Sequence, residues 1–135
     1  MKKIFILILL TIHLFGNNVE MAKDLFDNKE KHKEAIEIFQ KFPDDAESEY
    51  YLGKAYYYGM GVEKDERKAF EYAKKSADKN NSSGLNLLGV IYLDGKYVSK
   101  NEELALNYYN KASNLGNTKA IKNLASMYEN GEYVN

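Results

Sequence analysis

A serine and a lysine three residues apart are the first candidates for chemistry in this chain. Ser76-Ala77-Asp78-Lys79 has the Ser-x-x-Lys letters of a serine nucleophile with a lysine beside it, an arrangement found in some serine hydrolases. The partner motifs Ser-Asp-Asn and Lys-Thr-Gly do not occur in the sequence. Because Ser76 takes the position at which a later repeat has Ala112, we expect it to be a small buried residue that bonds back to the preceding helical turn.

Other residue types that commonly do chemistry are scarce. The chain has no cysteine and two histidines, of which His13 lies in an apolar N-terminal segment and His32 stands alone. A Ser-His-Asp triad or a multi-histidine zinc site would have to be built around His32. The adjacent carboxylates Asp44-Asp45 and Glu102-Glu103 lie where helices are expected to begin, so we interpret them as caps. We expect no metal and no cofactor, and a net charge of −1 predicts no nucleic-acid surface.

An internal repeat organises the rest of the chain. Five residues recur in the same order at intervals of 36 positions (88 − 52, for example). The three copies are Leu52, Gly53, Tyr56, Gly59 and Val62; Leu88, Gly89, Tyr92, Gly95 and Val98; and Leu124, Ala125, Tyr128, Gly131 and Val134. Repeats of this length are typical of solenoids, in which each unit buries its apolar face against its neighbours. The sequence therefore predicts an all-α fold, a right-handed α-solenoid of antiparallel helix pairs.

Capping residues and apolar spacing locate the helices. Asp65 and Asn101 precede the second helix of their repeats, where their side chains can accept hydrogen bonds from free backbone N–H groups. Gly53 and Gly89 fall inside first helices, where glycine costs up to about 1 kcal/mol relative to alanine, so we expect a neighbouring helix to approach closely there. The helices are expected near residues 19–27, 31–41, 46–58, 66–79, 83–93, 102–115 and 118–130.

The N-terminal segment has the pattern of a secretory signal peptide. Lys2 and Lys3 form a charged start, and the apolar run from Ile4 to Phe15 is too short to span a bilayer comfortably. We expect residues 1–16 to be a signal peptide cleaved after Gly16, with an uncleaved anchor as the alternative. The mature protein would be exported, periplasmic or secreted, with no stable membrane insertion after cleavage.

The repeat pattern resembles the Sel1-like repeat, a relative of the tetratricopeptide repeat. The residues that carry the resemblance are Leu52-Gly53, Tyr56, Gly59, Gly61-Val62, Asp65, Lys68-Ala69, Tyr72 and Lys75. The second copy departs from the pattern at Tyr97 and Leu104. The resemblance implies repeats at residues 46–81 and 82–117 and a partial repeat at 118–135, preceded by a degenerate capping helix pair at 17–45.

Proteins similar to this one usually hold a protein or peptide on the concave surface formed by the first helices. By that analogy the resemblance implies a binding surface of Tyr50, Lys54, Tyr57, Tyr58, Asn86, Val90, Leu93, Lys122 and Ser126. Tyr57 and Tyr58 are the expected anchors, because tyrosine offers a large contact area with a polar tip. The alternative for any one of these tyrosines is simple packing between helices.

The resemblance also leaves an enzyme open as an alternative. Some secreted, cysteine-rich Sel1-like proteins are classed as β-lactamases or penicillin binders, and this chain is similar to them in repeat type and in its expected export. It departs from them in having no cysteine. If the protein is an enzyme, the resemblance implies a β-lactamase-type hydrolase.

The third copy has a first helix but no second helix to cover it. Leu124, Met127, Tyr128 and Val134 would normally be packed by that second helix. We therefore expect this open C-terminal end to pair with another chain or to self-associate with a second copy, or else the gene to be truncated, since large exposed apolar patches mark association sites.

Overall fold

The computed structural model describes residues 1–131, apart from the side chains of residues 7–15, and the regular elements in this part of the chain are all helices. The helices are α1 (Lys2–Phe26), the 3-10 helix η1 (Lys29–Lys31), α2 (His32–Phe39), α3 (Ala46–Tyr58), α4 (Glu66–Asp78), α5 (Ser82–Asp94), α6 (Glu102–Asn114) and α7 (Thr118–Glu129). Their order and bounds confirm the expected α-solenoid, with most ends within one or two residues of the predicted ones. Val134 and the end of the third copy lie outside the described residues.

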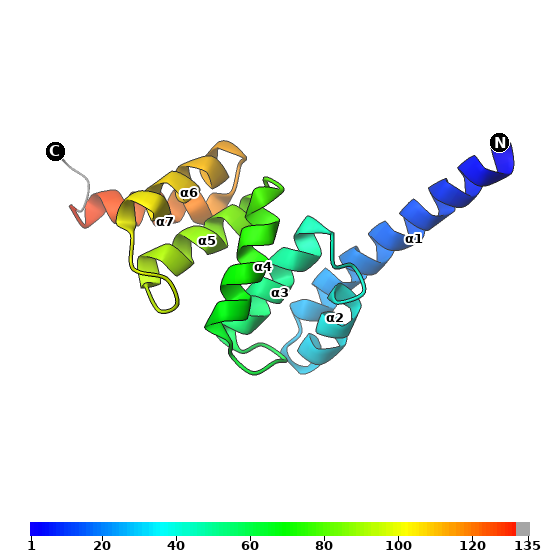
Figure 1. Ribbon diagram of the computed structural model, residues 1–135, viewed down its shortest axis with the longest axis horizontal. Coiled ribbons are helices and arrows are strands. Elements are labelled where there is room, and N and C mark those ends of the chain that lie inside the picture. The colour runs from blue at the N-terminus through cyan, green and yellow to red at the C-terminus, as the bar shows by residue number, and fades with distance from the viewer. Residues whose placement is uncertain (132–135) are drawn as a thin grey trace.

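The helices follow one another along the molecule as hairpins. Figure 1 shows α1 projecting at one end and α7 lying at the other, with α3 to α6 between them. Helix α3 packs on α4, α4 on α5, and α5 on α6, so that each unit is covered by the next. Contacts between α3 and α5 bring the first helices of neighbouring repeats side by side.

Helix α1 is longer than the helix expected near residues 19–27. It begins at Lys2 and continues through the predicted cleavage position at Gly16. Its C-terminal part buries Val19, Ala22 and Phe26 against the body, because spacings of three and four residues place them on one face. Within the described residues, no helix is both long and apolar enough to cross a membrane.

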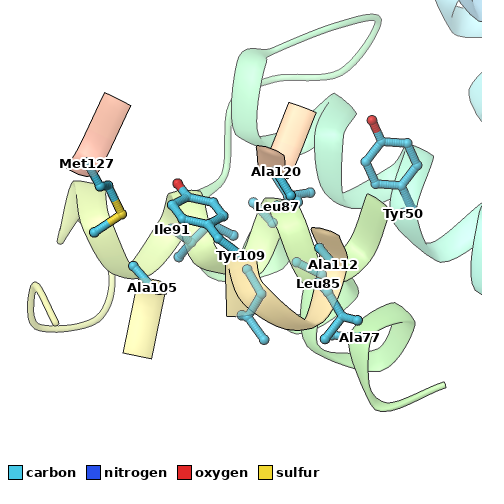
Figure 2. Packing of buried hydrophobic residues seen from close by; sticks show 13 residues of the cluster. Tyr50, Ala77, Leu85, Leu87, Ile91, Ala105, Tyr109, Ala112, Ala120 and Met127 are labelled. Atoms are coloured by element: carbon cyan, nitrogen blue, oxygen red, sulfur yellow. The ribbon is translucent and has the colours of Figure 1, made fainter. Parts of the chain in front are cut away.

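Two apolar clusters form the core. One lies between α1, α2 and α3 and includes Phe26, Phe39 and Leu52. The other extends from α3 to α7 and includes Leu88 and Tyr109, and Figure 2 shows part of this packing. Full burial of such a side chain contributes about 1.5–3 kcal/mol, so the solenoid is held by contacts between successive helices.

The predicted caps are confirmed. Asp65 Oδ1 accepts a hydrogen bond from Lys68 N, and Asn101 Oδ1 accepts one from Leu104 N, both at 2.9 Å. Of the two candidates before α3, Asp45 is the cap, since its carboxylate accepts from the backbone N–H of Ser48 at 2.7 Å.

The glycines inside the first helices lie where another helix approaches closely, as predicted. A Cβ built on Gly53 would lie 3.1 Å from the backbone nitrogen of Ala73. One built on Gly89 would lie 2.7 Å from Cε1 of the buried Tyr109 ring. Glycine thus allows α3 to approach α4, and α5 to approach α6, closely enough to bury these contacts.

Candidate functional site

The exposed surface of α3, α5 and α7 is here called the first-helix face. Hydrogen bonds between side chains align the N-terminal ends of these helices. Asn81 Nδ2 donates to Glu47 Oε1 at 2.7 Å, and Asn117 Nδ2 donates to Ser83 Oγ at 3.4 Å. Asn81 and Asn117 also cap α5 and α7, so each asparagine both starts its own helix and ties it to the preceding one.

A second set of hydrogen bonds joins the same helices farther along. Tyr57 Oη on α3 donates to Asp94 Oδ2 on α5 at 2.7 Å, and Lys96 Nζ lies 2.9 Å from the same oxygen. Asn123 Nδ2 on α7 donates to Asn86 Oδ1 on α5 at 2.9 Å. Polar bonds of this kind fix the relative positions of α3, α5 and α7, and hence the geometry of the face.

The contacts around Asp94 shift the pKa values of both Tyr57 and Asp94. Burial raises the pKa of Tyr57, and so does its hydrogen bond to the carboxylate. Burial acts to raise the pKa of Asp94, but hydrogen bonds from Lys96 and Tyr57 outweigh it, and the pKa is lowered overall. At neutral pH the face therefore carries a neutral tyrosine hydroxyl bound to an ionised carboxylate.

Lys54 occupies a half-buried position at the centre of α3. Its ammonium nitrogen lies 5.1 Å from the ring centroid of Phe26 and 5.8 Å from that of Tyr51, within the range of cation–π attraction. Burial lowers the pKa of Lys54, and the charge of Lys119 on α7 lowers it further, while Asp27 acts in the opposite direction. The charge of a lysine from the third repeat therefore reaches Lys54 in the first repeat across the face.

The remaining predicted residues differ in how far they can be reached. Tyr58 is 59% exposed, and its ring stands edge-on to that of Tyr57, with centroids 4.8 Å apart. Val90 and Leu93 are half-buried and pack on the core with their outer sides free. Lys122 and Ser126 are exposed on α7.

Two of the predicted contact residues lie mostly inside the protein. Tyr50 and Asn86 are each only 9% exposed. Tyr50 is part of the core cluster, which is the packing role that the sequence left open, and Asn86 is bound to Asn123. We therefore leave both out of the contact surface considered below.

The sequence did not predict two residues that contact the site but do not belong to the 36-residue repeat pattern. Phe26 contributes its ring beneath Lys54 from α1, which does not follow the 36-residue pattern. Lys96 reaches Asp94 from the loop after α5, and repeats give no rule for loop side chains. Tyr51 was detectable, because it precedes Lys54 by three residues and so shares its helix face.

Ser76 is buried as predicted, but its hydrogen bond differs from the expected one. Its hydroxyl is fully buried and donates to the backbone carbonyl of Ala46 at 2.7 Å, which joins α4 to the start of α3 instead of the preceding turn. Lys79 Nζ pairs with Glu49 Oε1 at 2.5 Å. The serine and lysine of the Ser-x-x-Lys match therefore each bind another group, and the pair is not arranged as a nucleophile with its base.

Other parts of the described chain are weaker candidates for a functional site than the first-helix face. His32 packs its ring on Phe26 with centroids 5.0 Å apart, and the described residues hold no group of three side chains placed to bind a metal. An open pocket of about 610 Å³ lies between α1 and the α2–α3 loop, with Val19 and Pro43 among its apolar lining residues. Its lining also includes charged residues, of which Asp45 and Glu47 already accept hydrogen bonds from Ser48 and Asn81. Because Gly16, the predicted cleavage position, forms part of its wall, we consider the first-helix face the stronger candidate.

The sequence and the helical architecture of this chain match a known repeat family and known structures. The Sel1 repeat profile matches residues 46–81, 82–117 and 118–135. A Sel1 repeat protein from Oxalobacter formigenes has a similar structure, with a TM-score of 0.75 and 24% identity over 84% of this chain and 46% of that one. A protective antigen present in uropathogenic Escherichia coli strains, c5321, which displays an SLR fold, gives a TM-score of 0.72 and 21% identity over 87% of this chain and 26% of that one.

The chain spans less than half the length of either of these solved structures. No curated protein matches it. The likeness in structure shows the fold, and the profile covers two thirds of the sequence in the register of the 36-residue repeat. The chain therefore belongs to the Sel1 repeat family.

Proposed function

We propose that this protein is a binding scaffold that holds a protein or peptide on its first-helix face. A Sel1 repeat scaffold suits protein–protein interaction in general. The observation that carries the proposal is the combination of an exposed aromatic side chain, Tyr58, with a half-buried cation, Lys54, one helical turn away on the same face of α3.

The fixed positions of the three helices favour binding. Side-chain hydrogen bonds join α3 to α5 and α5 to α7, so little conformational entropy is lost when a ligand lies across them. Tyrosine is enriched among residues that dominate interfaces, because it buries a large area while its hydroxyl stays hydrogen-bonded. Tyr58 would supply this contact, with Val90 and Leu93 as the adjacent apolar surface.

Selection from a displayed random peptide library tests this function. The full chain is the bait, and enriched peptides are then measured against Tyr58→Ala and the matched control Tyr97→Ala. Tyr97 is likewise an exposed tyrosine, 45% exposed, but it lies in the loop between α5 and α6.

The proposal predicts peptides that bind the wild type and Tyr97→Ala equally and bind Tyr58→Ala at least about tenfold more weakly. Enriched peptides that are indifferent to Tyr58, or a selection that enriches none, would contradict it.

We also propose that the protein is exported and that residues 1–16 are removed. The support is in the sequence, where Lys2 and Lys3 precede the apolar run from Ile4 to Phe15. Cleavage after Gly16 would leave Val19, Ala22 and Phe26, the residues of α1 that pack on the body, in the mature chain. Mass spectrometry of the protein recovered from fractionated bacteria should find Asn17 at its N-terminus outside the cytoplasm. An intact Met1 in the cytoplasmic fraction would refute the proposal.

A further inference from the structure

Lys54 is distinguished among the described lysines by being half-buried as well as unpaired. On α4, Lys74 lies 2.9 Å from Asp78 and Lys68 lies 3.9 Å from Asp65. Among the described residues, Lys54, Lys119 and Lys122 have no carboxylate within ion-pair distance. Exposed lysines without an ion pair also occur on the second helices, for example Lys75 and Lys111. The charge of Lys119 reaches Lys54 strongly enough to lower its pKa, second only to burial.

Two carboxylates at this face are already engaged, and a third, Asp27 at the end of α1, acts on Lys54 and offsets its loss of charge stabilisation only in part. Asp94 is bound by Tyr57 and Lys96 through one oxygen. Glu47 accepts from Asn81 at 2.7 Å and lies 3.9 Å from Lys23. Apart from the partial effect of Asp27 on Lys54, the positive charge of the three lysines is left to be balanced by solvent or by a ligand.

Glu129 is the one acidic residue of α7 and lies at the C-terminal end of that helix. It follows Lys119 by ten positions (129 − 119). At about 1.5 Å per residue, Glu129 is about 15 Å from Lys119 and about 10 Å from Lys122 along the helix axis, in both cases more than a Debye length at physiological salt. Glu129 therefore does little to neutralise the lysine group.

We propose that the ligand of the first-helix face is an acidic peptide segment, with its carboxylates over Lys54, Lys119 and Lys122 and an apolar or aromatic side chain on Tyr58, Val90 and Leu93. This inference rests on the proposed function and adds the chemistry of the partner. A carboxylate brought to Lys54 gains a charge-assisted hydrogen bond at a site that already excludes part of the water. It also offsets the repulsion that Lys119 exerts on Lys54, which Asp27 relieves only in part.

The repeat register explains how one segment can meet all these groups. Lys54, Val90 and Ser126 occupy equivalent positions on α3, α5 and α7, each 36 residues from the next (90 − 54). A peptide that crosses the three helices therefore meets a cation, an apolar side chain and a hydroxyl in turn. Lys119 and Lys122 border the path on the α7 side.

The test uses two pools of short rhodamine-labelled peptides that differ only in charge. In the acidic pool, Asp and Glu alternate with random apolar and aromatic residues, and in the amide pool Asn and Gln replace them. Binding to the full chain is measured by fluorescence anisotropy at low and at physiological salt. The proposal predicts that the acidic pool binds about tenfold more tightly than the amide pool, and that this difference shrinks as salt is added.

Variants of the protein test which lysines bind the carboxylates of the peptide. Lys54→Met keeps an unbranched side chain over Phe26 and Tyr51, and Lys119→Gln changes only an exposed residue, so both should fold. Each should weaken acidic-pool binding about tenfold and so narrow the difference between the acidic and amide pools. The matched control is Lys75→Met, because Lys75 also lies over a tyrosine ring, Tyr72 at 5.7 Å, but on the opposite helix of the hairpin.

The outcomes separate this inference from the function on which it rests. Equal binding of the two pools, with loss in Tyr58→Ala, would refute the acidic partner and keep the binding scaffold. Absence of binding by both pools, together with a failed display selection, would refute both. Tighter binding of a single-stranded oligonucleotide than of the acidic pool, lost in Lys54→Met, would overturn the peptide in favour of a phosphate ligand.

Discussion

Gly89→Ala tests the packing that sets the spacing of the helices. A Cβ at this position would lie 2.7 and 2.8 Å from Cε1 and Cδ1 of Tyr109, whose side chain is 1% exposed. Carbon atoms in favourable contact are about 3.5–4.0 Å apart, so the ring would have to move by about 0.8 Å or more. Tyr109 is enclosed by the core on all sides and has no free direction in which to move.

The matched substitution is Gly53→Ala in the preceding repeat. There the nearest atoms to the new Cβ are 3.1–3.3 Å away, and a shift of a few tenths of an ångström accommodates them. The difference arises because Ala73 takes the position in α4 that Tyr109 takes in α6. Alanine in a helix gains about 1 kcal/mol over glycine at either position, whereas overpacking costs about 1–3 kcal/mol at Gly89 alone.

We therefore expect Gly89→Ala to be less stable than the wild type by about 1 kcal/mol. Gly53→Ala should lie within about 1 kcal/mol of the wild type or be more stable. The free energy of unfolding from urea denaturation, followed by circular dichroism, measures both. If Gly89→Ala proves as stable as Gly53→Ala, the close approach of α5 and α6 is wrong.

Three further predictions concern charges and caps. Glu49 is 1% exposed and pairs with Lys79. Lys79→Met should therefore cost about 2 kcal/mol of stability by leaving a buried carboxylate unpaired, whereas Glu49→Leu should be neutral or stabilising. Urea denaturation that ranks the two variants the other way would contradict this. The lowered pKa of Asp94 contributes stability that is present above about pH 4 and is lost as pH falls through the folded-state pKa. The stability difference between wild type and Asp94→Asn should therefore shrink between pH 6 and pH 2, and a difference independent of pH would refute it. Asp65→Ala should cost about 1 kcal/mol, since the cap of α4 is lost, and an unchanged melting temperature would show that the cap is dispensable.

Much of the fold could be predicted because each repeat obeys the same local rules. Leu52, Leu88 and the glycines recur at fixed spacing, and such a pattern specifies helix length, turn and buried face together. Gly59 and Gly95 indeed adopt positive φ values of 70° and 68° at the helix ends. The N-terminal part was harder, since α1 has no repeat register and its full extent had to come from the structure.

The site was less predictable than the fold, because register does not decide burial. Tyr50, Asn86 and Lys122 occupy the same repeat position, but Tyr50 and Asn86 are buried and Lys122 is exposed. The difference arises because α3 and α5 are each followed by another first helix, whereas α7 is not, among the described residues. Position alone also could not show that Tyr57 binds Asp94 or that Lys54 lies over Phe26. Those contacts join helices from different units, and a sequence pattern gives their residues without their side-chain geometry.

NMR chemical-shift mapping with an acidic peptide that the protein binds is the most direct test of binding on the first-helix face. The peptide is titrated into the full chain labelled with nitrogen-15, and the backbone amide shifts are followed residue by residue. Binding on the first-helix face predicts the largest changes in α3, α5 and α7, around Lys54, Tyr58 and Val90, with little change along the outer surface of α4 and α6. Changes centred on α4 and α6, or on α1 and the α2–α3 loop, would contradict this account.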